Sequence, residues 1–147
     1  MLQPIIQEQT TGCGIASAAV LLGHSYAQMK AIANAMGIFA EDESLWSDTH
    51  YVRRLLATGD LVVSPTEQPF ESWLALPDLA LLAIKYHVEC GRPFWHWVVF
   101  ERTGPDMRVL DSASYLPANV RTDFDAMQPR WYIEVRQLAE VESDGIQ

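Results

Sequence analysis

Cysteine and positive charge are both scarce in this chain of 147 residues. Two cysteines occur, Cys13 and Cys90, which is too few for a disulfide framework, although a single bridge between them stays open. The 10 lysines and arginines face 19 aspartates and glutamates, which gives a formal net charge of −9 at pH 7. Binding to nucleic acid or to an anionic membrane surface needs clustered positive charge, so the composition argues against both. A basic peptide or protein partner remains compatible with it.

Long apolar runs are missing as well. No stretch approaches the roughly 20 apolar residues of a membrane span, and the first residues, MLQPIIQEQ, lack the basic and apolar regions of a secretory signal. We therefore expect a cytoplasmic protein without a membrane segment. The length suits one domain, predicted over residues 1–138, followed by an acidic tail over 139–147.

The first part of the chain predicts helices, and the second part predicts strands. Small and apolar residues run from Cys13 to Leu22, and Gly23 follows in the position of a helix C-terminal cap. The next helix is expected after Ser25, which forms a capping box with Gln28. The remaining expected elements are a helix over 47–58 and strands over 61–63, 79–87, 94–102, 107–111 and 130–138. Helices followed by strands with short turns indicate an α+β fold with an antiparallel sheet.

The segment TGCG places Cys13 between two glycines at the start of the first predicted helix. Backbone N–H groups and the helix dipole favour negative charge there, so they favour the thiolate over the thiol. Gly12 and Gly14 are expected to allow a sharp turn and the close approach of a substrate backbone. We interpret Cys13 as a nucleophile. The alternative is a small core residue that packs the start of the helix.

His96 opens the apolar strand WHWVVF, where a polar imidazole needs a reason to be. The strands over 94–102 and 107–111 are joined by the turn TGPD, which brings the end of the second strand back beside the start of the first. Asp111 can therefore orient His96 as a base for Cys13. A structural histidine, and an aspartate that caps the turn with the serines beyond it, are the alternatives.

Acyl transfer also needs hydrogen-bond donors for the developing oxyanion. The backbone N–H of Cys13 can supply one donor. A side-chain amide upstream can supply the other, and Gln3, Gln7 and Gln9 are all available.

The run HVEC also suggests a metal pair formed by His87 and Cys90. Zinc would want four ligands, and adding His96 would leave the set short while consuming the proposed base. We therefore expect no metal and no cofactor.

The order and spacing of these motifs resemble papain-like cysteine peptidases. More narrowly, they are similar to the bacteriocin-processing peptidase domains that remove double-glycine leader peptides. The resemblance is carried by QEQTTGCG with its small-residue helix and by HWVVFERTGPDMRVLDSA, and it spans roughly residues 3–115. It implies a papain-like fold, in which the helix that carries the nucleophile packs on a C-terminal antiparallel sheet. It implies that Gln7 is the oxyanion glutamine and Cys13 the nucleophile. It also implies that His96 is the base and Asp111 the acid that orients it.

These residues together predict a cysteine peptidase or amidase that cleaves a peptide or amide bond through an acyl-enzyme on Cys13. The same residues could instead pass the acyl group to an amine, as in a transferase. A non-catalytic peptide-binding domain of the same fold is a further alternative, as is a module whose acidic surface recruits a basic segment. The expected partner is a peptide or protein substrate. The sequence leaves its identity and the oligomeric state open.

Overall fold

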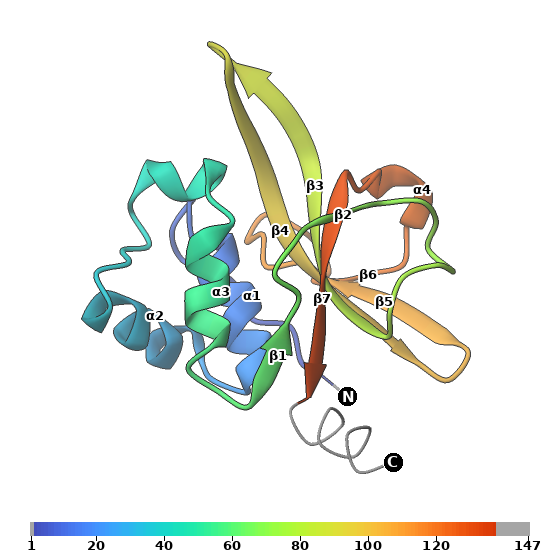
Figure 1. Cartoon of the computed structure of the whole chain (residues 1–147), viewed down its shortest axis with the longest axis horizontal. Helices are drawn as coiled ribbons and strands as arrows, with labels where there is room; N and C mark the ends of the chain where they lie inside the picture. The colour runs from blue at the N-terminus through green and yellow to red at the C-terminus, as the bar shows by residue number, and fades with distance from the viewer. Residues whose placement is uncertain (1, 138–147) are drawn as a thin grey trace.

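The computed structural model describes residues 2–137, and its helices come first in the chain. The first four helical segments are α1 (Cys13–Leu22), α2 (Tyr26–Ala35), the 3-10 helix η1 (Glu43–Ser47) and α3 (His50–Leu56). The elements that follow are β1 (Leu61–Val63), β2 (Gln68–Pro69), β3 (Leu79–Glu89), β4 (Arg92–Thr103), β5 (Asp106–Leu110), β6 (Val120–Arg121), α4 (Phe124–Met127) and β7 (Trp131–Gln137). Figure 1 shows α1, α2 and α3 gathered on one side of the sheet and α4 on the other.

The strands form one antiparallel sheet in the order β1-β7-β3-β4-β5-β6, with β2 also paired to β7. The last of the described strands, β7, therefore lies inside the sheet, between β1 and β3. The mixture of helices and antiparallel sheet agrees with the predicted α+β class.

Apolar side chains fill both faces of this sheet. Alternation along β4 sends Trp97 and Val99 into a core shared with the helices, where Ile15 of α1 is fully buried. Val98 and Phe100 point to the other face and pack in a second core. Helix α1 is buried on all sides, because every residue of it except its last one is buried. This central helix carries Cys13 at its start.

The predicted helix over 47–58 is present as the shorter α3, which begins three residues later and ends two residues earlier. The 3-10 helix η1 before it was not predicted, and Asp48 between the two has an extended backbone. The carboxylate of Asp48 accepts a hydrogen bond from the backbone N–H of His50 at 2.6 Å, which favours a new helix start at this point. The short elements β2, β6 and α4 were not predicted. The predicted tail over 139–147 lies outside the described residues.

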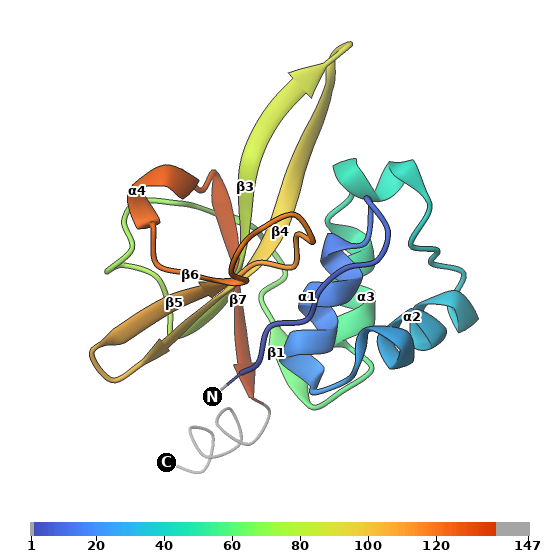
Figure 2. The ribbon, with the colours of Figure 1, turned by 180° about the vertical axis from the view of Figure 1, so that it is seen from behind.

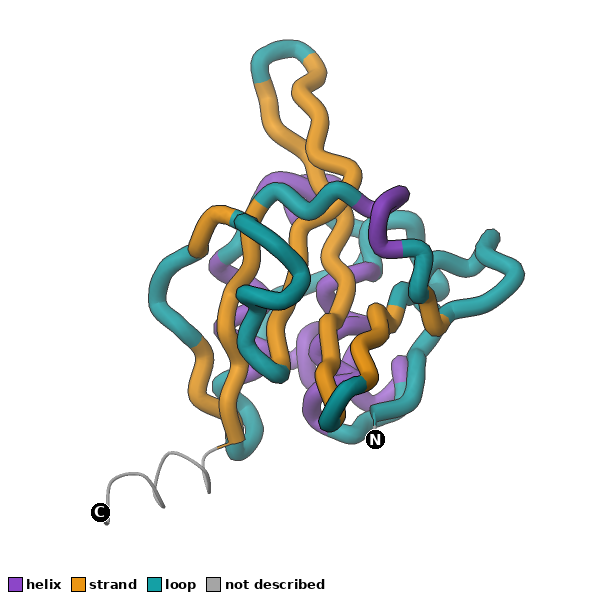
Figure 3. The backbone as a smooth tube through the Cα atoms, turned by 90° about the vertical axis from the view of Figure 1, so that its right-hand side faces the viewer, coloured by secondary structure: helices purple, strands orange, loops and turns teal. Residues whose placement is uncertain are grey.

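The strands β3 and β4 are longer than predicted and form an arm beyond the rest of the sheet (Figures 1 and 3). Strand β7 pairs with β3 over Ala80–Ala83, and β5 pairs with β4 from Val99 to Thr103. The two strands continue together past these partners to a turn at Cys90 and Gly91. A register shift between Ile84 and His87 marks the base of the arm.

Candidate active site

Cys13 is the first residue of α1 and is only 3% exposed. The glycines beside it are explained by close packing. A Cβ atom at Gly12 would overlap the hydroxyl of Tyr26, and one at Gly14 would overlap the ring of Tyr51. Gly12 has φ −90°, which any residue adopts. The two glycines therefore make room for two buried tyrosines.

The side chains of His96 and Asp111 are hydrogen-bonded to each other between the neighbouring strands β4 and β5. His96 lies on β4, and Asp111 directly follows β5, as the antiparallel pairing of these strands requires. The Nε2–H of His96 donates to Oδ1 of Asp111 at 2.7 Å. The aspartate side chain is fully buried, and the imidazole is 15% exposed. Cys13 acts on the same ring, because a side-chain hydrogen bond with Cys13 and the charge of Cys13 are among the causes that raise the pKa of His96.

This arrangement separates the pKa values of the acid and the base. Burial lowers the pKa of His96, but hydrogen bonds with Asp111 and Cys13, together with their charges, raise it to about 10. Burial raises the pKa of Asp111, but the hydrogen bond and charge of His96 outweigh it and lower the value to about 2. Asp111 is therefore ionised at neutral pH, and the imidazole is held in its charged form while it faces the sulfur.

Gln7 is hydrogen-bonded both to the loop after β5 and to the loop that leads into α1. Its backbone N–H donates to the Ser112 carbonyl at 2.9 Å, and its Oε1 accepts from the Ser112 hydroxyl at 2.7 Å. Its Nε2 donates to the carbonyls of Gln9 and Thr10, both at 3.0 Å. Figure 2 shows this N-terminal segment running beside the loop that follows β5. Gln7 thus fixes the loop that leads into α1, and its amide hydrogens point at that loop.

The other two glutamines differ in position. Gln9 accepts a hydrogen bond from the Tyr26 hydroxyl at 2.5 Å and lines the cavity beside the site. Gln3 is exposed and does not line that cavity. Gln7 and Gln9 are therefore the two amides that the fold brings to the cavity wall.

A cavity of about 420 Å³ opens beside His96. Its walls come from the N-terminal segment, η1, the β3–β4 arm and the loop after β5. They are formed by Gln7, Glu8, Gln9, Thr10, Trp46, Lys85, His87, Glu89, Phe94, Trp95, His96, Ala113, Ser114 and Tyr115. Cys13 is not part of this wall, so the cavity reaches the His96 imidazole and the Gln7 amide but leaves the sulfur covered.

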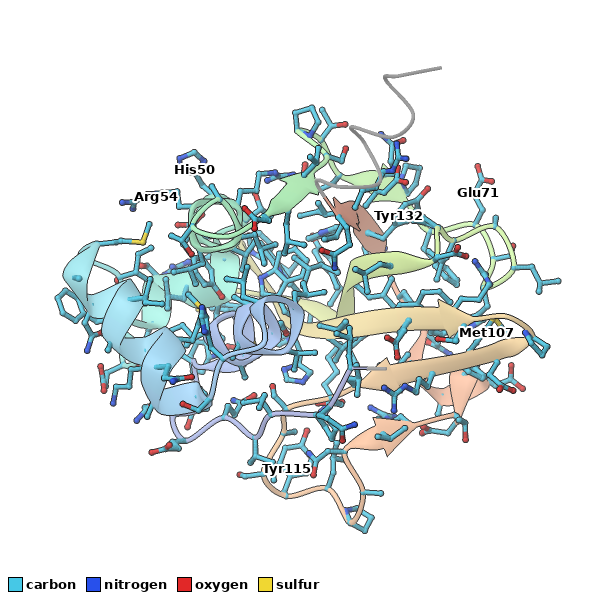
Figure 4. The ribbon with its side chains drawn as sticks, turned by 90° about the horizontal axis from the view of Figure 1, so that it is seen from below. His50, Arg54, Glu71, Met107, Tyr115 and Tyr132 are labelled. Carbon is cyan, nitrogen blue, oxygen red and sulfur yellow. The ribbon has the colours of Figure 1, made fainter. Side chains whose placement is uncertain are left out.

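The arm and the loop after β5 also touch each other across the cavity. The ammonium of Lys85 donates to the Tyr115 hydroxyl and lies 4.8 Å from the centre of its ring. Lys85 has φ 55°, a left-handed backbone that is uncommon outside glycine, at the register shift of β3. In Figure 4, Tyr115 lies on the loop after β5, away from His50 and Arg54 of α3. The bulge therefore directs Lys85 toward one wall of the cavity.

Three residues around Asp111 were not singled out from the sequence. Arg121 of β6 donates to Oδ2 of Asp111 at 2.9 Å. Asn119 donates from its side-chain amide to the backbone carbonyls of Asp111 and Ala113. Ser112 holds Gln7. Asp111 was predicted from the tight turn between two strands. Arg121 lies on β6, which has only two residues, and so short a strand has no recognisable sequence pattern.

The structure also bears on the disulfide, the metal site and the membrane segment considered from the sequence. Cys13 and Cys90 are free thiols, one buried and one exposed, so the bridge considered between them is wrong. Within residues 2–137, no group of three histidine, cysteine or acidic side chains is placed to hold a metal ion. His87 instead lies 3.4 Å from Glu89, with both side chains exposed. None of the described helices is both long and apolar enough to cross a membrane.

Comparison with known proteins gives one informative result. No protein-family model and no curated protein sequence matches the chain. A solved structure does match: the crystal structure of a double-glycine motif protease from an AMS/PCAT transporter, in complex with the leader peptide. The two share 16% sequence identity and superpose with a TM-score of 0.60, over 93% of this chain and 92% of that chain. The protein therefore has a fold similar to that of a double-glycine motif protease.

Proposed function

We propose that the protein is a cysteine peptidase or amidase that works through an acyl-enzyme on Cys13. One observation carries the proposal: an imidazole hydrogen-bonded to a buried carboxylate at 2.7 Å also contacts a cysteine at the start of a helix. A nucleophile, a base and an orienting acid in this relation are the parts that acyl transfer needs. The fold shared with a protease adds support.

The proposed reaction begins from a pair in which His96 already holds the proton given up by the Cys13 thiol, since its imidazole is charged at neutral pH. The thiolate attacks the carbonyl carbon of the substrate, and the carbonyl electron pair moves to oxygen. The Cys13 N–H and the Gln7 amide stabilise this oxyanion, for which Gln7 exchanges one of its bonds to the loop. The imidazolium protonates the leaving amine as the C–N bond breaks. Water, deprotonated by His96, then attacks the thioester carbon. The C–S bond breaks, the acyl group leaves as a carboxylic acid, and Cys13 and His96 return to their starting state.

We further propose that the substrate is a peptide. The cavity beside His96 has aromatic walls and several backbone and amide groups, which suits an extended chain. The protease with the similar fold was solved with a leader peptide, so a peptide with a double-glycine motif is the first substrate to test. Transfer of the acyl group to an amine needs the same residues and a second substrate in place of water.

A second candidate is a peptide-binding domain that cleaves nothing. The observation that favours it is the burial of Cys13, which is 3% exposed and does not line the cavity. A domain of this kind would keep the cavity and leave the thiol inert.

The test is the rate at which iodoacetamide alkylates Cys13 between pH 4 and pH 10, read by mass spectrometry with Cys90 as the internal reference. If Cys13 acts with His96, its rate rises with a midpoint well below the ~8.5 of a free thiol. His96→Ala is expected to move the midpoint up and to slow alkylation at pH 6 about 100-fold. Cys90 is expected to be unaffected.

His50→Ala is the matched control, because His50 is an exposed histidine at the start of α3 and does not line the cavity. It should leave the profile of Cys13 unchanged. If Cys13 titrates like Cys90, or if His96→Ala has no effect, the proposed enzyme is ruled out and the binding domain is supported.

A further inference from the structure

The carboxylate of Asp111 has two oxygens, and His96 uses one of them. Oδ1 accepts from His96 at 2.7 Å and from the backbone N–H of Ala113 at 3.1 Å. Oδ2 accepts from Nη1 of Arg121 at 2.9 Å. The aspartate side chain is completely buried, so water does not replace any of these donors. The ionised state of the acid therefore depends on Arg121 as well as on His96.

Arg121 is itself held in place by a second carboxylate. Its Nε and Nη2 donate to the two oxygens of Asp123, at 3.0 and 2.7 Å, in the paired geometry that fixes the guanidinium plane. The backbone of β6 adds a further restraint, because Arg121 pairs with Val109 of β5. The guanidinium is 14% exposed, whereas the side chain of Asp123 is 52% exposed. A chain of charges thus runs from the surface through Arg121 and Asp111 to His96.

We propose that Arg121 is a positioning residue that sets the pH range over which Cys13 is reactive. It would do so by holding Asp111 ionised and in the rotamer that presents Oδ1 to His96. The inference rests on the proposed function, since it concerns the same thiol and imidazole. Arg121 acts through Asp111 and touches neither the sulfur nor the cavity wall.

Loss of the Arg121 guanidinium has two physical effects, and both make the Cys13 thiolate harder to form. A neutral residue at 121 leaves Oδ2 buried without a donor, so Asp111 takes up a proton more easily and supports the imidazolium less. Removing a positive charge from this region also makes a thiolate less favourable. The charged groups that face one another here are Cys13 of α1, His96 of β4, Asp111 after β5, and Arg121 and Asp123 at β6. Both effects push formation of the thiolate to higher pH.

The experiment is the pH profile of Cys13 alkylation by iodoacetamide in the wild type, Arg121→Met, Arg121→Gln and Arg121→Lys, with the full chain and Cys90 as reference. We expect Met and Gln to raise the midpoint by about one pH unit, which lowers the rate at pH 6 about tenfold. Lysine keeps the charge but not the paired geometry, so its midpoint should lie between those of the wild type and the Met variant.

Arg108→Met is the matched control. Arg108 is also a largely buried arginine in an ion pair, with Glu101 at 2.8 Å. It lies on β5, three residues before Asp111, and its hydrogen bonds go to Glu101 and to the Leu2 carbonyl. Its loss should lower stability and leave the midpoint of Cys13 unchanged. A midpoint that shifts equally in Arg108→Met would assign the effect to general destabilisation and overturn the proposal.

The remaining outcomes separate the two proposals. If the wild-type midpoint lies well below that of Cys90 and the Met and Gln variants keep it, Arg121 does not set the pH range, and the peptidase proposal survives. If Lys shifts the midpoint as far as Met, the charge of Arg121 is not what matters and the inference is wrong. If the wild-type Cys13 titrates like Cys90, the proposed function itself fails. The Gln variant decides the question if the Met variant does not fold.

Discussion

The dipeptide Cys-Gly occurs twice in this chain and has a different structural role in each place. At Cys13 and Gly14 it starts the central helix, with the thiol buried and in contact with His96. At Cys90 and Gly91 it forms the turn of the β3–β4 arm, with the thiol exposed and φ angles of 51° and 77°.

The difference lies in what surrounds each pair. Gly14 is required by a neighbour, because the ring of Tyr51 occupies the space of a Cβ atom. Gly91 is required by its own backbone, because no atom lies within 4 Å of its Cβ position while its φ is positive. The same dipeptide therefore forms a closely packed helix start in one place and a two-residue hairpin turn in the other. Three experiments test this contrast, ordered by the size of the expected effect.

The largest effect is expected from Gly14→Ala. The added methyl would lie 2.5 and 2.6 Å from two ring carbons of Tyr51, which is itself 3% exposed and cannot move into solvent. We expect a loss of about 3 kcal/mol in the free energy of unfolding, measured with urea. Gly91→Ala should cost about 1 kcal/mol, through backbone strain alone.

A double variant checks the cause of this loss. Tyr51→Leu shortens the side chain that fills the space, so Gly14→Ala should cost at least about 1 kcal/mol less in that background than in the wild type. Equal costs in the two backgrounds would mean that Tyr51 is not the reason for this glycine.

The next effect concerns the dependence of stability on pH. The pKa of His96 is raised to about 10, above the ~6.5 of an unfolded chain, so its stabilisation is complete below about pH 6.5 and is lost as the pH rises toward 10. We expect the wild type to lose on the order of 2 kcal/mol more than His96→Gln between pH 6 and pH 10, measured by urea unfolding.

The histidine near the other cysteine supplies the control. His87 forms an exposed ion pair with Glu89, and such pairs contribute little to stability. His87→Gln should therefore follow the wild-type profile. Parallel profiles for the wild type and His96→Gln would show that the buried pair is not what makes stability depend on pH.

Much of the helical part could be predicted because its signals are local. The bounds of α1 agree with the prediction, and Gly23 has the left-handed φ of 75° that a helix cap requires. Ser25 and Gln28 form the predicted capping box. The 3-10 helix η1 was missed, because it has only five residues and no apolar periodicity marks it. Elements as short as β6 have no local signal, because sheet pairing alone defines them.

The proximity of His96 and Asp111 could be predicted, because it follows from two antiparallel strands joined by a short turn. The turn between β4 and β5 places Asp111 beside His96, and the sequence contains that turn. The contact of Arg121 with Asp111 could not be predicted, because it depends on where the chain returns after a loop. The burial of Cys13 agrees with the alternative that it packs the start of the helix, but the sequence alone could not decide between that packing and an exposed thiol.

The smallest effect is expected at the turn itself. Cys90 adopts φ 51°, a conformation that asparagine tolerates better than other side chains, and Asn-Gly is the preferred pair for a two-residue hairpin turn. Cys90→Asn should therefore stabilise the protein by about 0.5 kcal/mol in urea unfolding and leave the alkylation profile of Cys13 unchanged. The mirror substitution, Cys13→Asn, should destabilise the protein, because it puts a polar amide in a buried helix start. If asparagine were equally well accepted at both cysteines, the two Cys-Gly pairs would not differ in the way proposed. Opposite signs would show that burial at Cys13 and backbone conformation at Cys90 decide what each position accepts.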